Sequence, residues 1–391
     1  MRPLVLTATT VVSAIGRGAA ETWAALRERR GGLRPCDFHG VTAGHVGRVA
    51  NLEAHTLPPD LARFDCRNNR LADLALRTDG FADAVAAARD RYGPARIAVI
   101  LGTSTSGVLA TEEAYRARDP DTGALPDWFD YQHTHAMFSL AHFVRAALAL
   151  RGPAMVISTA CTSSAQTFID AARLIDSGVC DAAVVGGADS LCGMTLHGFA
   201  SLELISPVPC RPGDAARSGI SIGEAAGFAL LERSGDGIAL LGCGASCDGY
   251  HMSAPHPQAA GAIAAMQAAL AAAGLSSGDI DYVNLHGTGT RANDAMEDLG
   301  VVSVFGSGTP CSSTKGWTGH TLGASGIVEA AVAGLCIRHG FMPGGLNVTT
   351  LDPAFRARVI VDNRKAPVGR VMSNAFGFGG INCSLIFGAA A

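Results

Sequence analysis

Hydrophobic and polar positions along the chain alternate between two patterns, one typical of buried strands and one typical of helices. Short apolar runs that stop at glycine or a small polar residue predict buried strands at 96–101, 155–158, 181–187, 227–232, 238–242 and 281–285. Longer segments with apolar residues at helical spacing predict helices at 71–91, 163–177, 259–273 and 326–339. Alternating strands and helices predict an α/β protein whose sheets are covered by helices on both faces.

The two ends of the chain and one turn near its middle complete this pattern. Residues 1–16 are rich in β-branched residues and predict a first strand rather than a signal peptide. Residues 370–387 predict a strand, a glycine turn and a second strand. Ser234-Gly-Asp-Gly237 separates two predicted strands and predicts a hairpin turn. We place a division there, giving an N-terminal half, 1–234, and a C-terminal half, 235–391, that share one core.

Composition narrows the class of protein. The chain has 391 residues, of which 48% are hydrophobic and 16% charged, enough to bury a large core in two fused halves. A net charge of −4 gives no electrostatic basis for binding nucleic acid. No apolar run reaches the roughly 18–20 residues that cross a bilayer. The 11 cysteines are scattered without framework spacing, which is typical of reduced thiols and predicts a cytoplasmic protein.

Cys161 has the setting of a nucleophile. It follows a predicted strand and precedes a predicted helix, in the run Val156-Ile-Ser-Thr-Ala-Cys-Thr-Ser-Ser-Ala165. The positive end of a helix lowers the pKa of a thiol, and small polar neighbours leave the sulfur accessible. Most of the other cysteines are expected to be buried small hydrophobic residues.

Two histidines lie in glycine-rich turns far downstream of this cysteine. His286 begins the run His-Gly-Thr-Gly-Thr, and His320 ends the run Lys315-Gly-Trp-Thr-Gly-His. Glycine turns allow close approach of the backbone, which a lone structural histidine does not require. A cysteine with two such imidazoles suggests nucleophilic catalysis served by a histidine pair.

This set of motifs resembles the β-ketoacyl-acyl-carrier-protein synthases. The resemblance implies the thiolase-like duplicated α/β/α/β/α five-layered fold. It also implies that Cys161 accepts an acyl chain, that malonyl carrier protein loses CO₂ beside His286 and His320, and that the resulting carbanion attacks the thioester. Two donors on the thioester oxygen would stabilise the enolate as an oxyanion hole does. No cofactor and no metal is implied.

The same resemblance assigns further residues around the histidines. Lys315 and Glu329 are expected to pair and to order the histidine site without touching substrate. Thr288 and Thr290 match hydroxyls that contact the phosphopantetheine arm, although both could be plain turn residues.

The C-terminal glycine turn and one upstream loop are expected to bind the acyl thioester. Gly377 and Gly379 flank Phe378, whose backbone N–H would form the oxyanion hole together with that of Cys161. The Phe378 ring would gate the acyl pocket. In the loop 102–107, the position of the usual bulky gate is taken by Thr105.

Two other patterns are weak evidence for a metal site or a phosphate-binding site. Cys243, Cys247 and His251 are spaced by four residues, but they have no second ligand pair and begin in a predicted strand, so a zinc site is not expected. The loop 102–107 is rich in glycine and hydroxyl residues but lacks the Gly-Lys-Ser/Thr ending of a phosphate loop.

Several positions depart from the housekeeping enzymes of fatty-acid synthesis. Ser218-Gly-Ile220 replaces the usual Asp-Gly-Phe, and Trp317 stands where a smaller residue is common. The runs 66–70, 101–107 and 251–258 resemble ketosynthases of aryl polyene and xanthomonadin-type pigment clusters. The predicted substrates are therefore unsaturated or aryl-capped acyl chains, with saturated fatty-acid elongation as the alternative.

Two alternatives of other classes remain open at this point. A thiolase would use a second cysteine in the C-terminal turn, where this chain has Phe378 and places Cys383 further on. A non-catalytic chain-length factor would lack the nucleophile. The expected partners are acyl and malonyl carrier proteins and a second subunit, either identical or a chain-length-factor-like homologue, joined across the strand that leads into Cys161.

Overall fold

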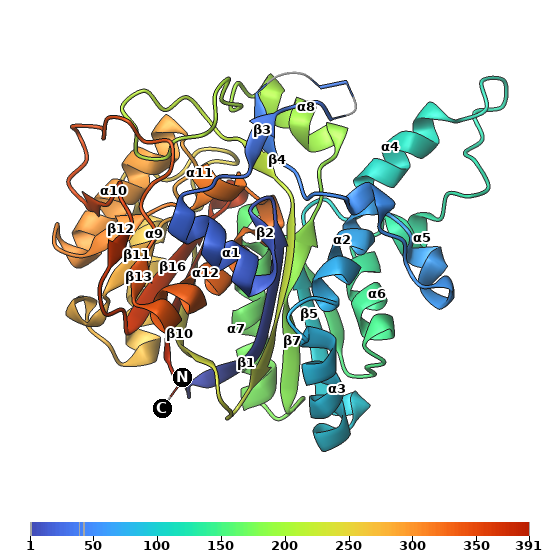
Figure 1. Cartoon of the computed structure of the whole chain (residues 1–391), viewed down its shortest axis with the longest axis horizontal. Helices are drawn as coiled ribbons and strands as arrows, with labels where there is room; N and C mark the ends of the chain where they lie inside the picture. Colours follow the sequence, from blue (N-terminus) through green and yellow to red (C-terminus); the bar gives the residue numbers. More distant parts are fainter. Residues whose placement is uncertain (1, 39, 42–43, 391) are drawn as a thin grey trace.

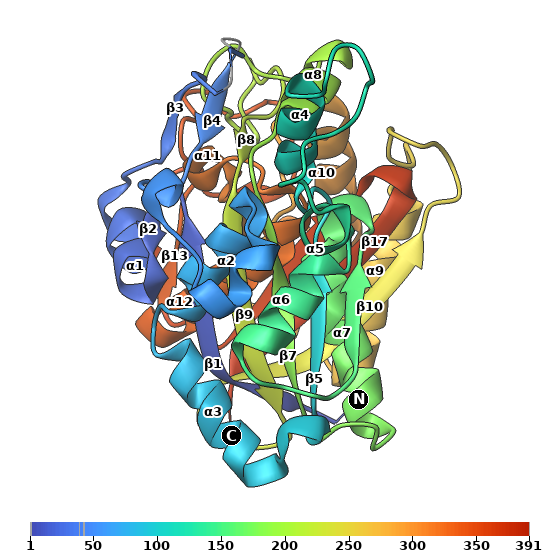
Figure 2. The same cartoon turned by 90° about the vertical axis from the view of Figure 1, so that its right-hand side faces the viewer.

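A single mixed sheet runs through the middle of the molecule. The structure is a computed structural model and describes residues 2–38, 40–41 and 44–390. The sheet has twelve strands, in the order β14-β12-β11-β16-β17-β10-β1-β9-β7-β5-β6, with β2 paired to β1. At its centre, β1 (Leu4–Ser13) pairs antiparallel with β10 (Ile238–Cys247) and so joins the two halves of the chain. Both termini lie at the same end of the molecule (Figures 1 and 2).

The two halves of this sheet repeat the same topology. The N-terminal half consists of β1, β5 (Ile97–Gly102), β6 (Ala154–Ile157), β7 (Ala182–Asp189) and β9 (Ala225–Glu232). The C-terminal half consists of β10, β11 (Tyr282–Asn284), β12 (Pro310–Ser312), β16 (Arg370–Phe376) and β17 (Ile381–Ala389). Numbered by position within each half, both have the strand order 3-2-4-5-1. In both halves the first three strands of that order are parallel and the last two pairings are antiparallel.

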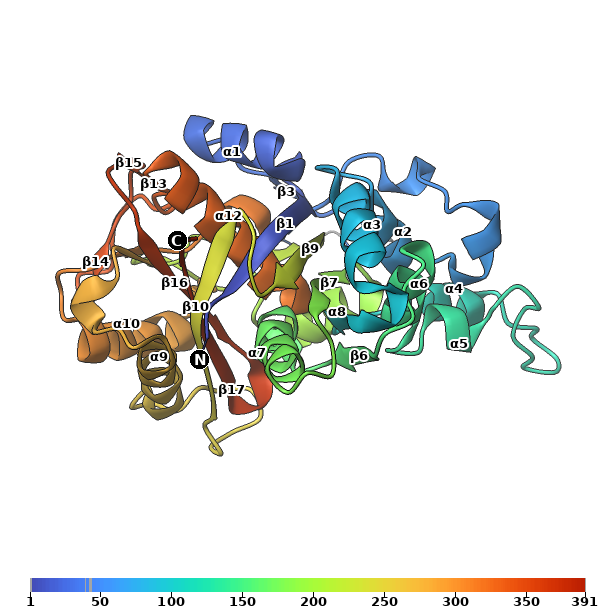
Figure 3. The same cartoon turned by 90° about the horizontal axis from the view of Figure 1, so that it is seen from below.

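Helices form three layers around the two half-sheets. The middle layer consists of α7 (Ser163–Asp176) and α12 (Ser325–His339), which contact each other. One outer layer consists of α2 (Arg67–Leu76), α3 (Phe81–Tyr92) and α6 (Ser139–Ala147). The other consists of α9 (Ala260–Ala273) and α10 (Arg291–Phe305). Figures 2 and 3 show the first outer layer covering its half-sheet and the second lying on the opposite side of the molecule.

Alternating side chains on the strands bury both faces of each half-sheet. On β5, Ala98 and Ile100 join the apolar cluster around the middle helices, whereas Val99 and Leu101 join the cluster beneath the first outer layer. That middle cluster contains residues of both halves, and the rings of Phe168 and Phe387 meet there at 5.9 Å between centroids. The five-layered, duplicated α/β fold expected from the sequence is confirmed.

Shorter elements lie around this core. The helices are α1 (Gly18–Glu28), α4 (Val108–Arg116), α5 (Tyr131–Thr134), α8 (Gly193–Ser201) and α11 (Lys315–Thr318). The strands are β2 (Gly16–Arg17), β3 (Leu33–Pro35), β4 (His45–Gly47), β8 (Ile222–Gly223), β13 (Phe341–Met342), β14 (Arg358–Val359) and β15 (Arg364–Lys365). In the described part of the chain, no helix is both long enough and apolar enough to cross a membrane.

The predicted hairpin at Ser234–Gly237 is wrong. β9 and β10 do not pair with each other, because β1 lies between them and pairs antiparallel with both. Val5 of β1 stands opposite Glu232 on one side and Ala239 on the other. The turn reverses the chain locally, but the strand that lies between β9 and β10 is β1, which is more than 200 residues earlier in the sequence.

The helix predicted over 71–91 is also interrupted. It divides into α2 and α3, because Asp79 and Gly80 adopt left-handed backbone conformations, with φ of 57° and 69°. A left-handed residue breaks the helical hydrogen-bond pattern, and Gly80 adopts this conformation without strain. The other predicted strands and helices are present, with ends that differ by a few residues.

Candidate active site

Cys161 lies where the middle helix α7 begins. The chain leaves β6, passes through Ala160 in a left-handed conformation (φ 52°), and forms a short 3₁₀ turn, Ala160–Thr162, before the helix. The other half repeats this geometry, with Leu322 (φ 51°) and the turn Leu322–Ala324 ahead of α12. The duplication therefore places Cys161 and Gly323 at equivalent positions, one at the start of each middle helix.

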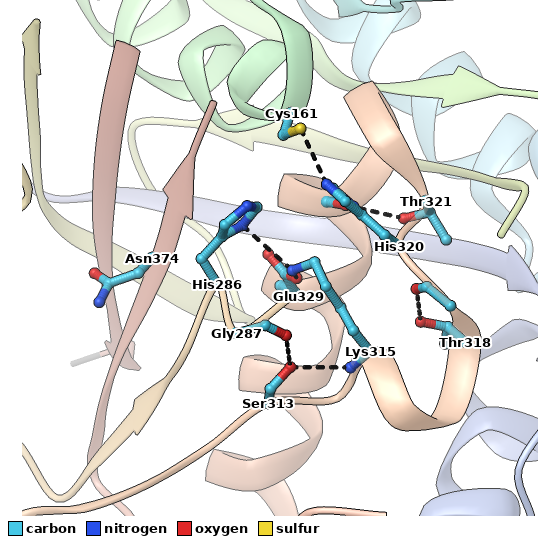
Figure 4. A network of polar contacts seen from close by, with 12 residues as sticks. Cys161, His286, Gly287, Ser313, Lys315, Thr318, His320, Thr321, Glu329 and Asn374 are labelled. Carbon is cyan, nitrogen blue, oxygen red and sulfur yellow. Dashed lines mark hydrogen bonds and ion pairs between the residues drawn. The ribbon is translucent and has the colours of Figure 1, made fainter. Parts of the chain in front are cut away.

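His320 contacts the sulfur of Cys161 directly. Its Nε2 lies 3.0 Å from Cys161 Sγ (Figure 4). Its Nδ1 accepts a hydrogen bond from the backbone N–H of Leu322 at 3.3 Å. Ser325 Oγ lies 2.9 Å from the same Nδ1. Because a backbone N–H can only donate, Nδ1 is an acceptor and the neutral ring carries its hydrogen on Nε2. That N–H is directed at the sulfur.

His286 reaches the same point from the end of β11. Its Nδ1 lies 3.3 Å from Lys315 Nζ, and Lys315 forms a buried ion pair with Glu329. The lysine donates to Nδ1, which again leaves the ring hydrogen on Nε2. One nitrogen of each imidazole and the sulfur of Cys161 lie within 4.8 Å of one another. The structure thus brings together all five residues expected to form the catalytic group.

Burial and charge keep both imidazoles neutral. Burial lowers the pKa of His286 and of His320 well below the ordinary value, and the charge of Lys315 lowers both further. At neutral pH each ring therefore presents one N–H donor and no positive charge. Such a pair suits the stabilisation of a developing oxyanion better than the donation of a proton.

The pKa of the Cys161 thiol is raised, whereas its position at a helix terminus predicts a lowered pKa. Burial raises the pKa of this thiol to about 11, while the charge of Lys315 and the backbone N–H of Phe378 oppose the rise. Cys161 is only 7% exposed, so loss of hydration outweighs the helix terminus. Because the thiolate is a minor form at neutral pH, each donor that faces the sulfur contributes to its reactivity.

The C-terminal glycine turn lies against the cysteine. The backbone N–H of Phe378 points at Cys161 Sγ, and a Cβ atom on Gly377 would lie 3.4 Å from the backbone nitrogen of Cys161. Gly379 has a φ of 84° and donates its N–H to Met252 O at 2.7 Å. The Phe378 ring packs beside Phe199, with 5.8 Å between centroids. This places the backbone N–H of Phe378 at the sulfur and the glycine turn close to the backbone nitrogen of Cys161, the other donor expected to form an oxyanion hole.

A cavity of about 410 Å³ opens in front of Cys161. Among the residues that line it are Cys161, His286, Thr288, Thr290, Ser218, Ile220, His320, Gly377, Phe378 and Gly379. Thr288 Oγ1 and Thr290 Oγ1 lie 2.9 Å apart on one wall, where they can meet a polar chain. The cavity is the size of a small-molecule site and leads from the surface to the sulfur.

Four of the residues singled out in the sequence do not join the catalytic group. Thr105 is buried and donates its hydroxyl to Asp189 at 2.8 Å, and it does not line the cavity in front of the sulfur. Its assignment to the acyl pocket remains a prediction. Trp317 is buried in the middle core, with Nε1 donating to Gly344 O at 3.3 Å. In the described residues, Cys243 and Cys247 form no metal-sized cluster with a histidine.

Glu297 of α10 belongs to the site and was not found from the sequence. Its buried carboxylate accepts the backbone N–H groups of His286 (2.8 Å) and Gly287 (2.7 Å), which holds the turn that carries His286. Burial raises the pKa of Glu297 to about 7, and those two N–H groups oppose the rise. No motif marks this residue, because an acid within a helix normally faces solvent.

Comparisons with known proteins show which family the chain belongs to. A model of the β-ketoacyl synthase N-terminal domain matches residues 1–236, and one of the C-terminal domain matches residues 238–349. Nodulation protein E of Rhizobium meliloti (strain 1021) is 33% identical, with 99% of each chain covered. The 3-oxoacyl-[acyl-carrier-protein] synthase 2 of the same organism is 31% identical, with 99% of this chain and 98% of that protein covered.

A solved structure shows the same fold over the whole chain. A chain from the complex of the ketosynthase ApeO with its chain length factor ApeC, from Xenorhabdus doucetiae, superposes with a TM-score of 0.92 and 40% identity. The superposition covers 100% of this chain and 98% of the other. With both domain models matched and relatives aligned over nearly the full length, the chain belongs to the β-ketoacyl-acyl-carrier-protein synthases, a family of acyltransferases with the thiolase-like fold.

Proposed function

We propose that Cys161 carries the growing acyl chain and that His286 and His320 promote the decarboxylation of malonyl carrier protein. The observation that supports this most is the group of one thiol and two neutral imidazole N–H donors at the base of one cavity. Carrier proteins are the substrates of this enzyme family, and the pair of threonine hydroxyls on the cavity wall suits a phosphopantetheine arm.

In the first half-reaction the sulfur of Cys161 attacks the thioester carbonyl of the acyl carrier. The carbonyl oxygen gains negative charge, which the backbone N–H groups of Cys161 and Phe378 stabilise. The carrier thiol leaves with the proton released by Cys161, and a new thioester remains on the enzyme. Both donors are part of the backbone and need no rearrangement.

In the second half-reaction malonyl carrier protein loses its carboxylate as CO₂. The electron pair of the broken C–C bond moves onto the thioester oxygen, where His286 Nε2–H and His320 Nε2–H donate to the enolate. The enolate carbon then attacks the acyl thioester of Cys161. Expulsion of the Cys161 thiolate completes the condensation and leaves a β-keto chain on the carrier.

The structure favours this chemistry over both alternatives from other classes. A thiolase would need a second cysteine in the cavity, but Cys383 is fully buried on β17 in the core between the half-sheets. A non-catalytic subunit would not keep Cys161 Sγ in contact with His320 Nε2. Both residues also line the open cavity, where substrate can reach them.

We propose that the enzyme binds a second subunit of the same fold along β6. This strand is the edge of the sheet, and its Met155 is 38% exposed. Trp128, Tyr131 and Phe138, on the segment around α5, are each more than half exposed. Apolar residues exposed at a free strand edge are typical of an interface. The ketosynthase ApeO was solved with a chain length factor, which supports a similar partner here.

The Met155→Lys variant should weaken subunit association, because a charge would enter an apolar strand edge. Gel filtration with light scattering would measure this, on the chain alone and after co-expression with a chain-length-factor homologue. Leu299→Lys is the matched control, since Leu299 is 43% exposed on α10, far from β6. A wild-type chain that is fully active as a stable monomer would contradict the interface.

We further propose that the preferred acyl chains are unsaturated or aryl-capped, as in aryl polyene synthesis. Two of the positions that depart from the housekeeping enzymes, Ser218 and Ile220, line the cavity in front of Cys161. Their side chains differ in size and polarity from the usual aspartate and phenylalanine. A rigid conjugated chain cannot bend to fit a pocket, so such local changes in its wall bear directly on selection.

Condensation should be faster with aryl-enoyl carriers than with saturated acyl carriers of equal length. We expect a preference of about tenfold or more in kcat/KM, the scale at which pocket shape discriminates related chains. The double variant Ser218→Asp, Ile220→Phe should reduce this preference. Equal or better turnover of the saturated series by the wild-type enzyme would place it with the housekeeping fatty-acid synthases.

A further inference from the structure

Asp189, at the end of β7, is a fully buried carboxylate surrounded by donors. Its Oδ1 accepts from Thr103 Oγ1 at 2.7 Å, Ser104 N at 2.8 Å, and Thr105 N and Oγ1 at 2.9 and 2.8 Å. Its Oδ2 accepts from Ser104 Oγ and from Gly323 N, the latter at 2.6 Å. Asp189 has no part in the half-reactions described above, and it does not line the substrate cavity.

These contacts join three segments that are distant in the sequence. They connect the loop that follows β5, the end of β7, and the turn between His320 and α12. The fit at the turn is close, because a Cβ atom added to Gly323 would lie 2.7 Å from Asp189 Oδ2. The carboxylate therefore holds the backbone of the turn rather than a side chain that could rotate away.

The duplication shows what kind of position the carboxylate occupies. Gly323 is the counterpart of Cys161, and each follows a left-handed residue at the start of a middle helix. The backbone N–H of Cys161 is available to a substrate oxyanion, whereas that of Gly323 donates to Asp189. The same local geometry thus serves a transient anion in one half and a permanent anion in the other.

The hydrogen bond from Gly323 to Asp189 also affects the direction of the N–H of the preceding residue, Leu322. Leu322 has a left-handed conformation, which an L-residue adopts only at a cost, and the amide that follows it donates to Asp189. In that conformation the N–H of Leu322 points at His320 Nδ1, 3.3 Å away. The contact places the ring hydrogen on Nε2, which faces Cys161 Sγ at 3.0 Å.

We propose that Asp189 is a positioning residue that, through Gly323 and Leu322, holds His320 in the tautomer with its N–H directed at Cys161. This inference rests on the proposed roles of Cys161 and His320. It adds a residue from the other half of the molecule that acts on the histidine without touching substrate.

Loss of the Asp189 carboxylate would allow His320 to adopt its other tautomer. If the N–H of Leu322 turns away, His320 Nδ1–H can donate to Ser325 Oγ, and Nε2 becomes an acceptor. The ring would not compensate as a base, because burial and Lys315 hold the pKa of His320 well below its ordinary value. Both the sulfur anion and the enolate oxygen would then lack one donor.

The test compares Asp189→Asn with Asp181→Asn in the full-length enzyme and its native assembly. Asp181 precedes the same strand at its other end, where it pairs with Arg96 at 2.7 Å, so its loss controls for general weakening of β7. The Asp189 variant should react with iodoacetamide at Cys161 about tenfold more slowly between pH 7 and 9, the effect of one pKa unit on the thiolate fraction. When the logarithm of the alkylation rate is plotted against pH, the curve of the Asp189 variant should be shifted to higher pH by about one unit.

Condensation by the Asp189 variant should fall further than alkylation, by about 10²-fold in kcat, because the enolate also loses a donor. The KM for malonyl carrier protein should stay within about twofold, since the cavity wall is unchanged. The other charged and titratable groups around Cys161 are the same in both variants: His320, His286, Lys315 and Glu329. The charge of Asp189 itself raises the pKa of Cys161, so its removal alone would speed alkylation, and slower alkylation therefore reports the lost donor. A variant that melts at a lower temperature but keeps the wild-type pH profile and kcat would reduce Asp189 to a structural residue and overturn the proposal.

A second measurement does not depend on the variant folding. In the wild-type enzyme labelled with ¹⁵N-histidine, two-bond ¹H–¹⁵N correlation spectra should show His320 protonated on Nε2, with the assignment made from His320→Gln. Protonation on Nδ1 would overturn the proposal outright. Loading by Cys161→Ala tests the proposed nucleophile separately, so failure of that role would be distinguished from failure of the Asp189 inference.

Discussion

The Cys161→Ala variant should load no acyl chain from an acyl carrier and should make no condensation product, a loss of at least about 10³-fold. The reason is that no second cysteine can replace it in the cavity, since Cys383 is fully buried in the core. Intact-protein mass spectrometry after incubation with acyl carrier protein would detect the missing acyl adduct. Product analysis with malonyl carrier protein would detect the missing condensation.

Labelling of the wild-type enzyme provides the complementary measurement. Cerulenin should modify Cys161, and prior acyl loading should block this. Cys247 is the internal reference, because it is the exposed cysteine of the described residues and does not line the cavity. Cys247→Ala should load normally. An adduct on other thiols with none on Cys161 would show that the nucleophile is misassigned.

Substitution of either histidine should separate the two half-reactions. His286→Ala and His320→Ala should each retain part of the acyl loading, because the backbone N–H groups of Cys161 and Phe378 remain in place. Each should lose about 10²-fold or more in condensation, the effect of removing one oxyanion donor. Loading followed by mass spectrometry and release of labelled CO₂ from malonyl carrier protein would measure the two steps independently.

His339→Ala is the control for this pair. It lies at the exposed end of α12, stacked on Trp23 at 4.0 Å, and should leave both half-reactions unchanged. His320→Ala should lose more of the loading than His286→Ala, because only His320 lies in direct contact with the sulfur. Full condensation by His320→Ala would remove that residue from the mechanism.

Local patterns predicted most of the elements but not how they are joined. Buried strands such as 181–187 could be recognised because their apolar runs end in glycine, and β7 lies there. The hairpin at Ser234 failed because a turn reveals only that the chain reverses, and β1 occupies the space between its arms. The hydrophobic pattern of a strand does not indicate which distant strand it will pair with.

The same limit applied to the site. Cys161, His286 and His320 each lie in a glycine-rich or small-residue run, so motif and resemblance could identify them. Glu297 and Asp189 act through backbone N–H groups of other segments, and such contacts impose no pattern around the acid itself. The helix terminus at Cys161 was visible in the sequence, but the burial that outweighs it appears only when all layers are assembled.

The central place of β1 has a consequence for how the chain matures. Leu4 pairs with Leu240 and Val5 with Glu232, so β1 leaves the ribosome long before either of its neighbouring strands. Contacts of such sequence separation form slowly, because a long loop must close before they contribute. Until β9 and β10 have been made, β1 has no strand on either side of it, and an apolar strand with free edges favours chaperone binding and aggregation of the nascent chain.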